Sequence, residues 1–172
     1  MRIEQPPRIA EAAPCAGCGA VLPASAVPTH AYLGASSGCW AKFGEILAKE
    51  FGDRRFAAAH RLTVDAYAVQ HPGTPERRTV QSVAVHLIGL YAVLERGFDH
   101  ARATELIKNA ASRSDSFFWL TPPASLGAMT VLDVAAAGDN PDEHARLVAA
   151  WARNAWTAWA PHHDLIRLWA AI

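Results

Sequence analysis

The sequence has no excess of either charge, few cysteines and no long hydrophobic run, and each absence excludes a class of protein. Lys+Arg and Asp+Glu number 16 each among the 172 residues, so the formal net charge is zero. A chain without excess positive charge lacks the attraction that drives non-specific binding to phosphate backbones and anionic lipids. The longest apolar stretches are also shorter than the roughly 20 residues of a membrane-spanning helix. We therefore expect neither a nucleic-acid partner nor a membrane partner.

Two common catalytic motifs are missing as well. The chain has no phosphate-binding glycine loop and no H-E-x-x-H zinc helix. Its cysteines number three, and two of them form a C-x-x-C pair that is too close for an ordinary framework disulfide. The first residues form no apolar run of signal-peptide length. We expect a cytoplasmic protein whose thiols are reduced or bound to metal.

What the chain does contain predicts a helical fold. With 51% hydrophobic and 19% charged residues it can bury a core of ordinary size. We expect one all-α domain over residues 1–172: a compact bundle of five or six helices (39–172) after a looped, zinc-knuckle-like N-terminal cap (1–38). The cap holds five of the 11 prolines and shows no helical periodicity. Apolar spacing and end signals predict helices over 37–52, 53–70, 75–95, 99–112, 140–160 and from 161 onward, with a short element over 129–137.

The cap carries a pattern typical of a zinc site. Cys15 and Cys18 are two residues apart, a spacing at which two thiolates bind one zinc ion, and the glycines around Cys18 let the backbone turn. Cys39 is the remaining cysteine, and His30 is the single histidine before it. The predicted ligands are therefore Cys15, Cys18, His30 and Cys39, with the spacing C-x2-C-x11-H-x8-C. A bound zinc would supply folding free energy to a segment that has no core of its own.

Two points of this site stay open. His60 or His71 can replace His30 as the fourth ligand, because Cys39 begins the first helix and the cap can fold against the second. Cys39 also has a second interpretation, since a helix N-terminus lowers the pKa of a thiol and makes it nucleophilic. The run Ser-Gly-Cys-Trp around it resembles the nucleophile turn of papain-like proteases, but the first cysteine of that motif is missing.

A second constellation lies on the second and third helices. His60 and His71 fall on one face of the second helix, and an antiparallel hairpin about the His-Pro-Gly turn brings His60 level with His86. Two imidazoles and the carboxylate of Asp65 in one hairpin can bind a metal or transfer protons. The catalytic candidates are therefore His60, Asp65, His71 and His86. A structural role is the alternative, in which Asp65 pairs with Arg61 four residues away.

These motifs resemble an uncharacterised bacterial family, domain of unknown function 5946. The similarity covers residues 15–172, with a small departure where Ser-Ser-Gly-Cys stands in place of Ser-Pro-Gly-Cys. It implies no activity, but it implies that the cysteines and the histidine and aspartate candidates belong to recurring motifs of the family. The runs that carry it are C-A-G-C-G, H-A-Y-L-G-A-S-S-G-C-W, H-R-L-T-V-D-A-Y-A-V-Q-H-P-G, Q-S-V-A-V-H-L, F-W-L-T-P-P-A-S-L-G and W-A-P-H-H-D-L-I-R-L-W.

The sequence thus predicts a zinc-binding helical protein of unknown activity, a binding or structural module whose partner is an unidentified protein or small molecule. The alternative is a metal-dependent, hydrolase-like enzyme that uses the histidine and aspartate site of the second and third helices. A coordination position open to water distinguishes catalytic from structural zinc, so the geometry of the site bears directly on this choice.

Overall fold

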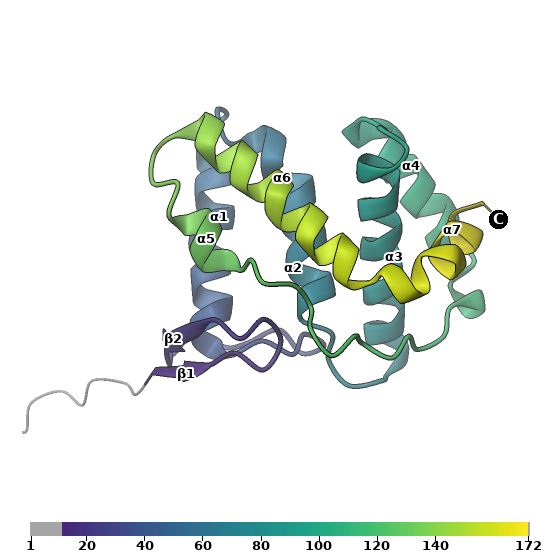
Figure 1. Cartoon of the computed structure of the whole chain (residues 1–172), viewed down its shortest axis with the longest axis horizontal. Coiled ribbons are helices and arrows are strands. Elements are labelled where there is room, and N and C mark those ends of the chain that lie inside the picture. The colour runs from purple at the N-terminus through teal and green to yellow at the C-terminus, as the bar shows by residue number, and fades with distance from the viewer. Residues whose placement is uncertain (1–11, 172) are drawn as a thin grey trace, which may run out of the picture.

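The computed structural model describes residues 12–171 as a helical body preceded by a small β-hairpin (Figure 1). Residues 1–11, the beginning of the predicted cap, and Ile172 lie outside the described residues. The described part contains seven α-helices where five or six were expected, because the short element predicted over 129–137 forms a helix of its own. The helices are α1 (Ser37–Gly52), α2 (His60–Gln70), α3 (Arg77–Leu94), α4 (His100–Ala111), α5 (Val131–Ala135), α6 (Pro141–Ala158) and α7 (His163–Ala171).

The hairpin is the main departure from the predicted fold, which left the whole cap without regular structure. Strand β1 (Ala12–Pro14) pairs antiparallel with β2 (Val21–Pro23). Gly19 makes the turn possible, since its φ of 77° lies in the left-handed region that glycine enters without steric cost. Strands of three residues are too short to show the alternation from which a strand is predicted.

Helix boundaries follow the capping signals closely. Asp99 accepts a hydrogen bond from the Arg102 N–H at the start of α4, and Asn140 accepts two at the start of α6. The N-cap of α1 is Ser36, one residue before the predicted Ser37. The second helix begins at His60 and not near residue 53, because turns and the 3₁₀ segment Ala57–Ala59 intervene.

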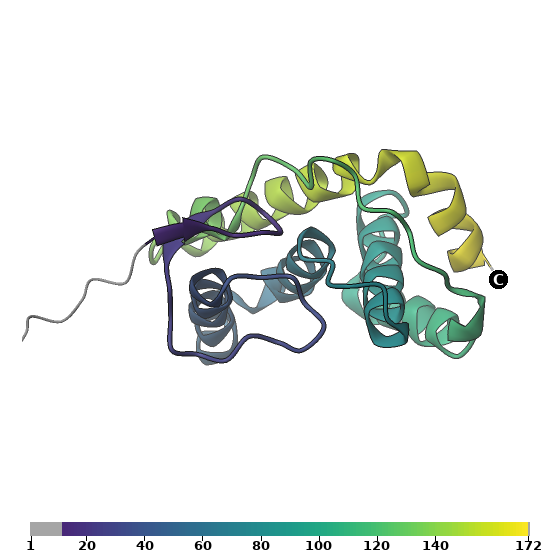
Figure 2. The ribbon, with the colours of Figure 1, turned by 90° about the horizontal axis from the view of Figure 1, so that it is seen from below.

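The core forms where α6 crosses the antiparallel pair α2 and α3 (Figures 1 and 2). Trp151 and Trp159 of this crossing are fully buried, as expected for packing residues. Their indole N–H groups donate to the Gln70 side chain at 2.8 Å and to the Val69 carbonyl at 3.1 Å, both at the end of α2. The C-terminal end of α2 is therefore held rigidly from the side of α6.

From the other side, the segment before α1 crosses the N-terminal end of α1 and the C-terminal end of α2 (Figure 2). Leu33 forms a β-bridge with Pro72, and the Gly34 N–H donates to the His71 carbonyl at 2.9 Å. At Gly38 a Cβ atom would come within 2.2 Å of the Pro23 carbonyl oxygen, so glycine permits this close approach. None of the helices between residues 12 and 171 is long and apolar enough to cross a membrane.

Candidate metal centre

The three cysteines converge on His71 at the junction just described. One ligand atom from each of Cys15, Cys18, Cys39 and His71 lies within 4.8 Å of all the others. Cys15 and Cys18 come from the turn of the β-hairpin, Cys39 from the first turn of α1, and His71 from the residue directly after α2. Cys15, Cys39 and His71 are buried and Cys18 is half-buried. This Cys3His cluster is a group that can bind a metal ion.

His30, which the spacing favoured as the fourth ligand, is not in this group. Its ring packs edge-on against Tyr32 at 4.2 Å and Trp40 at 5.6 Å between ring centroids. His71, which the sequence left open with His60 as an alternative fourth ligand, lies beside the three cysteines instead. The reason is spatial: the chain after the knuckle runs past the end of α2, which brings His71 next to Gly17 although they are far apart in sequence.

The spacing of the donors matches a tetrahedral zinc site. Zinc binds thiolate sulfur at about 2.3 Å and imidazole nitrogen at about 2.0 Å, so tetrahedral angles place two sulfurs about 3.8 Å apart and sulfur and nitrogen about 3.6 Å apart. The Cys18 and Cys39 sulfurs are 3.7 Å apart, and the Cys39 sulfur lies 3.4 Å from Nε2 of His71. All three cysteines are free, since a disulfide would bring two sulfurs to about 2 Å.

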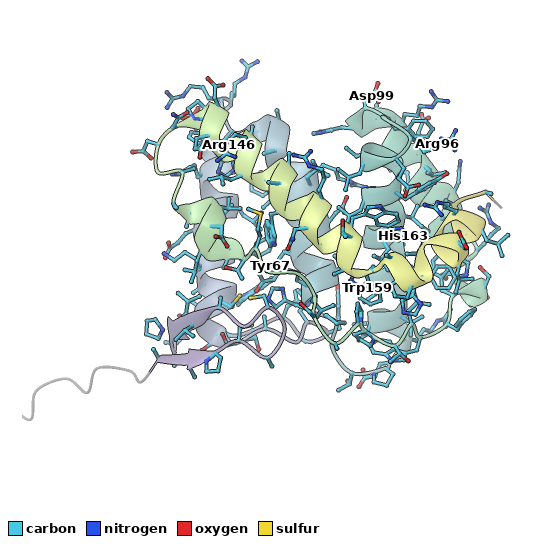
Figure 3. All side chains as sticks on the ribbon, viewed as in Figure 1. Tyr67, Arg96, Asp99, Arg146, Trp159 and His163 are labelled. Atoms are coloured by element: carbon cyan, nitrogen blue, oxygen red, sulfur yellow. The ribbon has the colours of Figure 1, made fainter. Side chains whose placement is uncertain are left out.

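Hydrogen bonds around the cluster orient its donors. Nδ1–H of His71 donates to the carbonyl of Tyr67 at 2.7 Å, which directs Nε2 toward the sulfurs, where it can bind a metal once it has lost its proton. The Ser36 N–H donates to the Cys15 sulfur at 3.3 Å, and the Tyr67 hydroxyl donates to the Cys39 sulfur at 3.6 Å. Figure 3 shows Tyr67 in the interior of the molecule, with sulfur atoms close to it. Donors of this kind stabilise the negative charge of thiolate ligands.

The backbone of the knuckle fits closely against the end of α2. The Cys15 N–H donates to the Ala20 carbonyl at 2.9 Å, and the Gly19 N–H donates to the Cys15 carbonyl at 2.8 Å. At Gly17 a Cβ atom would lie 2.5 Å from Cδ2 of His71 and 2.6 Å from the backbone oxygen of Gln70. Only glycine at this position lets both cysteines of the knuckle reach the histidine.

The electrostatics of the metal-free cluster show how strongly its members interact. Hydrogen bonds from the Cys18 and Cys39 thiols hold the pKa of Cys15 far below its ordinary value. Burial alone lowers the pKa of His71, but hydrogen bonds with the Cys15 and Cys18 sulfurs outweigh burial and raise it to about 9. Hydrogen bonds to the same two sulfurs, together with burial, raise the pKa of Cys39. A raised pKa is the opposite of what a nucleophilic thiol needs, so the papain-like interpretation of Cys39 has no support in this geometry.

The other predicted site residues do not meet at one point. Nδ1 of His86 lies 2.7 Å from the carboxylate of Asp65, whose second oxygen lies 3.0 Å from Nε of Arg61. His60 lies instead beside Glu50 of α1, at 2.9 Å. Within residues 12–171, the Cys3His cluster is the one group of three or more such side chains that could hold a metal ion. The candidates of the second and third helices therefore share no point at which a metal could bind.

The sequence reasoning missed two buried polar residues, Glu50 and His144, which are hydrogen-bonded to each other between α1 and α6. The carboxylate of Glu50 accepts hydrogen bonds from Thr63 at 2.5 Å, from His60 and from the buried His144 of α6, each at 2.9 Å. Glu50 directly precedes Phe51 near the end of α1, and nothing in the local pattern distinguishes it from a solvent-exposed acid. Its three partners come from other elements, so no short-range signal could have identified them.

Comparison with known proteins agrees with the sequence motifs. No curated protein and no solved structure matches the chain. One family does match, and its similarity runs over residues 13–160, which include all four residues of the Cys3His cluster. The chain belongs to the family of unknown function DUF5946.

Proposed function

We propose that the protein binds one zinc ion through Cys15, Cys18, Cys39 and His71, and that this ion stabilises a helical binding module. The observation that carries the proposal is the convergence of four buried or half-buried donor atoms within 4.8 Å of one another, together with a histidine whose Nδ1–H is already engaged. Three thiolates and an imidazole are the ligands that zinc prefers in structural sites. When bound, zinc would supply the cross-link between the hairpin, α1 and α2.

A structural role is favoured over a catalytic one by the completeness of the ligand set. Catalytic zinc has three protein ligands and one position for water or substrate, whereas structural zinc has four protein ligands. Cys39 and His71 have no solvent-exposed surface, which leaves no route for a substrate to reach a metal from the side of the helices. The hairpin contributes few apolar contacts of its own, so the ion adds folding free energy at the point where the hydrophobic effect adds little.

The proposed module belongs in a reducing compartment such as the cytoplasm, where thiols remain available for a metal. A net charge of zero supports a protein or small-molecule partner over nucleic acid or a membrane surface.

Metal analysis of four proteins tests the proposal: the wild type, Cys15→Ser, His71→Ala and His30→Ala. We expect one equivalent of zinc in the wild type and in His30→Ala, which is the matched control for loss of a partly buried imidazole. His71→Ala and Cys15→Ser should retain well below one equivalent and should unfold at lower temperature. Wild-type protein purified without chelators that contains no zinc and does not bind added zinc would contradict the proposal. Zinc loss in His30→Ala with retention in His71→Ala would overturn the ligand assignment.

A further inference from the structure

A cavity of about 180 Å³ lies beside Tyr67, and none of the four metal-binding residues lines it. Its walls are largely aromatic and apolar, and include Trp40, Phe43, Val64 and Tyr67. Phe43 and His71 stack on the two faces of the Tyr67 ring, with centroids 3.7 Å and 4.0 Å away, which holds Tyr67 rigidly at the edge of the cavity. An apolar cavity of about 150 Å³ is large enough for a benzene ring, so a flat six-membered ring fits here.

A second, more open cavity of about 380 Å³ adjoins the first. Both are lined by Tyr32, Ser82 and His86, so the two form one continuous site with an apolar inner part and a polar outer part. The outer part adds Arg78 and Gln81 of α3. No Asp or Glu lines either part, and Arg78 forms no ion pair with any described residue. The outer cavity is therefore suited to an anion.

The polar side chains of this site are held in place but incompletely partnered. The fully buried carboxylate of Asp65 engages Nδ1 of His86 at 2.7 Å, which fixes the ring and leaves Nε2 without a partner in the described part of the chain. Gly89 makes room for that carboxylate, since a Cβ there would lie 2.4 Å from its Oδ2. Nε2 of His86 therefore remains available for a hydrogen bond to a ligand, on a side chain that is 24% exposed.

We propose that this site binds a small molecule with a flat apolar body and one anionic group, the body beside Trp40 and Val64 and the anion beside Arg78 and His86. A module with such a site is a receptor or carrier for an aromatic acid, which goes beyond the proposed zinc-dependent stability. The site depends on α1, α2 and α3 and uses none of the four metal-binding residues.

The test uses the zinc-loaded full chain and three probes of increasing size: benzoate, phenylacetate and 2-naphthoate. Each is compared with its uncharged amide by calorimetry, and binding is located by the NMR signals of the His30 and His86 rings. A charge-assisted contact supports at least about tenfold tighter binding of the best acid than of its amide. Arg78→Gln should remove this preference and leave zinc content and thermal stability unchanged.

Arg77→Gln is the matched control, because Arg77 is the neighbouring arginine on α3, is exposed, pairs with Asp115 at 3.1 Å and lines neither cavity. It should bind the acids as the wild type does. Val64→Phe, which fills the inner cavity from α2, should abolish binding of acid and amide alike. The proposal is overturned if no acid binds at about 10 mM, which corresponds to an affinity too weak to be specific. Equal binding of acid and amide, or equal losses in Arg78→Gln and Arg77→Gln, overturns it as well.

Discussion

Gly17 offers the most direct test of how closely the knuckle must approach α2. In Gly17→Ala the new methyl group would lie 2.5 Å from Cδ2 of His71 and 2.6 Å from the Gln70 carbonyl oxygen. Ordinary contacts of a Cβ begin near 3.4 Å, so the gap must open by about 1 Å. The backbone oxygen cannot rotate away, and the His71 ring is buried and hydrogen-bonded to the Tyr67 carbonyl.

The expected loss of zinc affinity in Gly17→Ala follows from that displacement. Inserting a methyl group into a closely packed site costs about 1–3 kcal/mol. If the knuckle and the histidine separate to relieve the contact, this cost falls on the metal-bound state, and zinc affinity decreases by roughly tenfold to a hundredfold. A displacement near 1 Å is large compared with the tolerance of about 0.2 Å in metal–ligand distances, so the effect should lie toward the upper end.

Competition with a chromophoric chelator measures the affinity, and thermal unfolding with and without zinc measures the stability. Gly44→Ala is the control, because Gly44 is exposed in the middle of α1 and a Cβ there meets nothing within 4 Å. That variant should be more stable by about 0.5–1 kcal/mol, the usual gain of alanine over glycine inside a helix. Wild-type zinc affinity in Gly17→Ala would refute the close approach of the knuckle to His71.

Two further predictions concern the buried acid and the protons of the metal centre. Glu50→Ala should lower the free energy of unfolding by about 3 kcal/mol, because the buried Thr63 and His144 and the half-buried His60 lose their acceptor. Glu45→Ala on the exposed face of the same helix should change it by less than about 0.5 kcal/mol, and equal effects of the two variants in denaturant titrations would contradict this reasoning. Zinc binding near neutral pH should release at least two protons, since the pKa of His71 is about 9 and that of Cys39 is raised in the metal-free protein, and zinc binds both deprotonated. Zinc affinity should then fall at least about a hundredfold for each pH unit of acidification. Calorimetry in buffers of different ionisation enthalpy measures the number of protons released, and fewer than two would contradict these protonation states.

Most of the helical architecture could be predicted because its signals are local. Asp99 and Asn140 cap the helices that they were expected to begin, and α1 ends at the predicted Gly52. The hairpin between Ala12 and Pro23 escaped prediction because its strands are too short for a period and its stability depends on contacts outside it. The late start of α2 has a local cause that was overlooked: the Asp53 carboxylate accepts a hydrogen bond from the Arg55 N–H and favours a turn there.

The sequence predicted those parts of the candidate site whose residues lie close together along the chain. The C-x-x-C pair identified the knuckle, and Cys39 followed because no other cysteine was left. Proximity in sequence then favoured His30, whereas the structure brings His71 to the sulfurs through the close contacts of Gly17 and Gly34 with the end of α2. One local signal did point to His71: it follows Tyr67 by one helical turn, which lets Nδ1–H donate to the Tyr67 carbonyl and present Nε2 as a ligand.

Tyr67 connects the metal centre to the proposed ligand site. Its hydroxyl donates to the Cys39 sulfur, its carbonyl accepts from His71, and its ring forms a wall of the inner cavity. Burial is the main cause that raises the pKa of Tyr67, so the hydroxyl keeps its proton and remains a donor. A metal that fixes Cys39 and His71 therefore also holds Tyr67, and with it Phe43, in place at the edge of the inner cavity. Zinc bound at the Cys3His cluster would in this way preorganise the neighbouring cavity for a ligand.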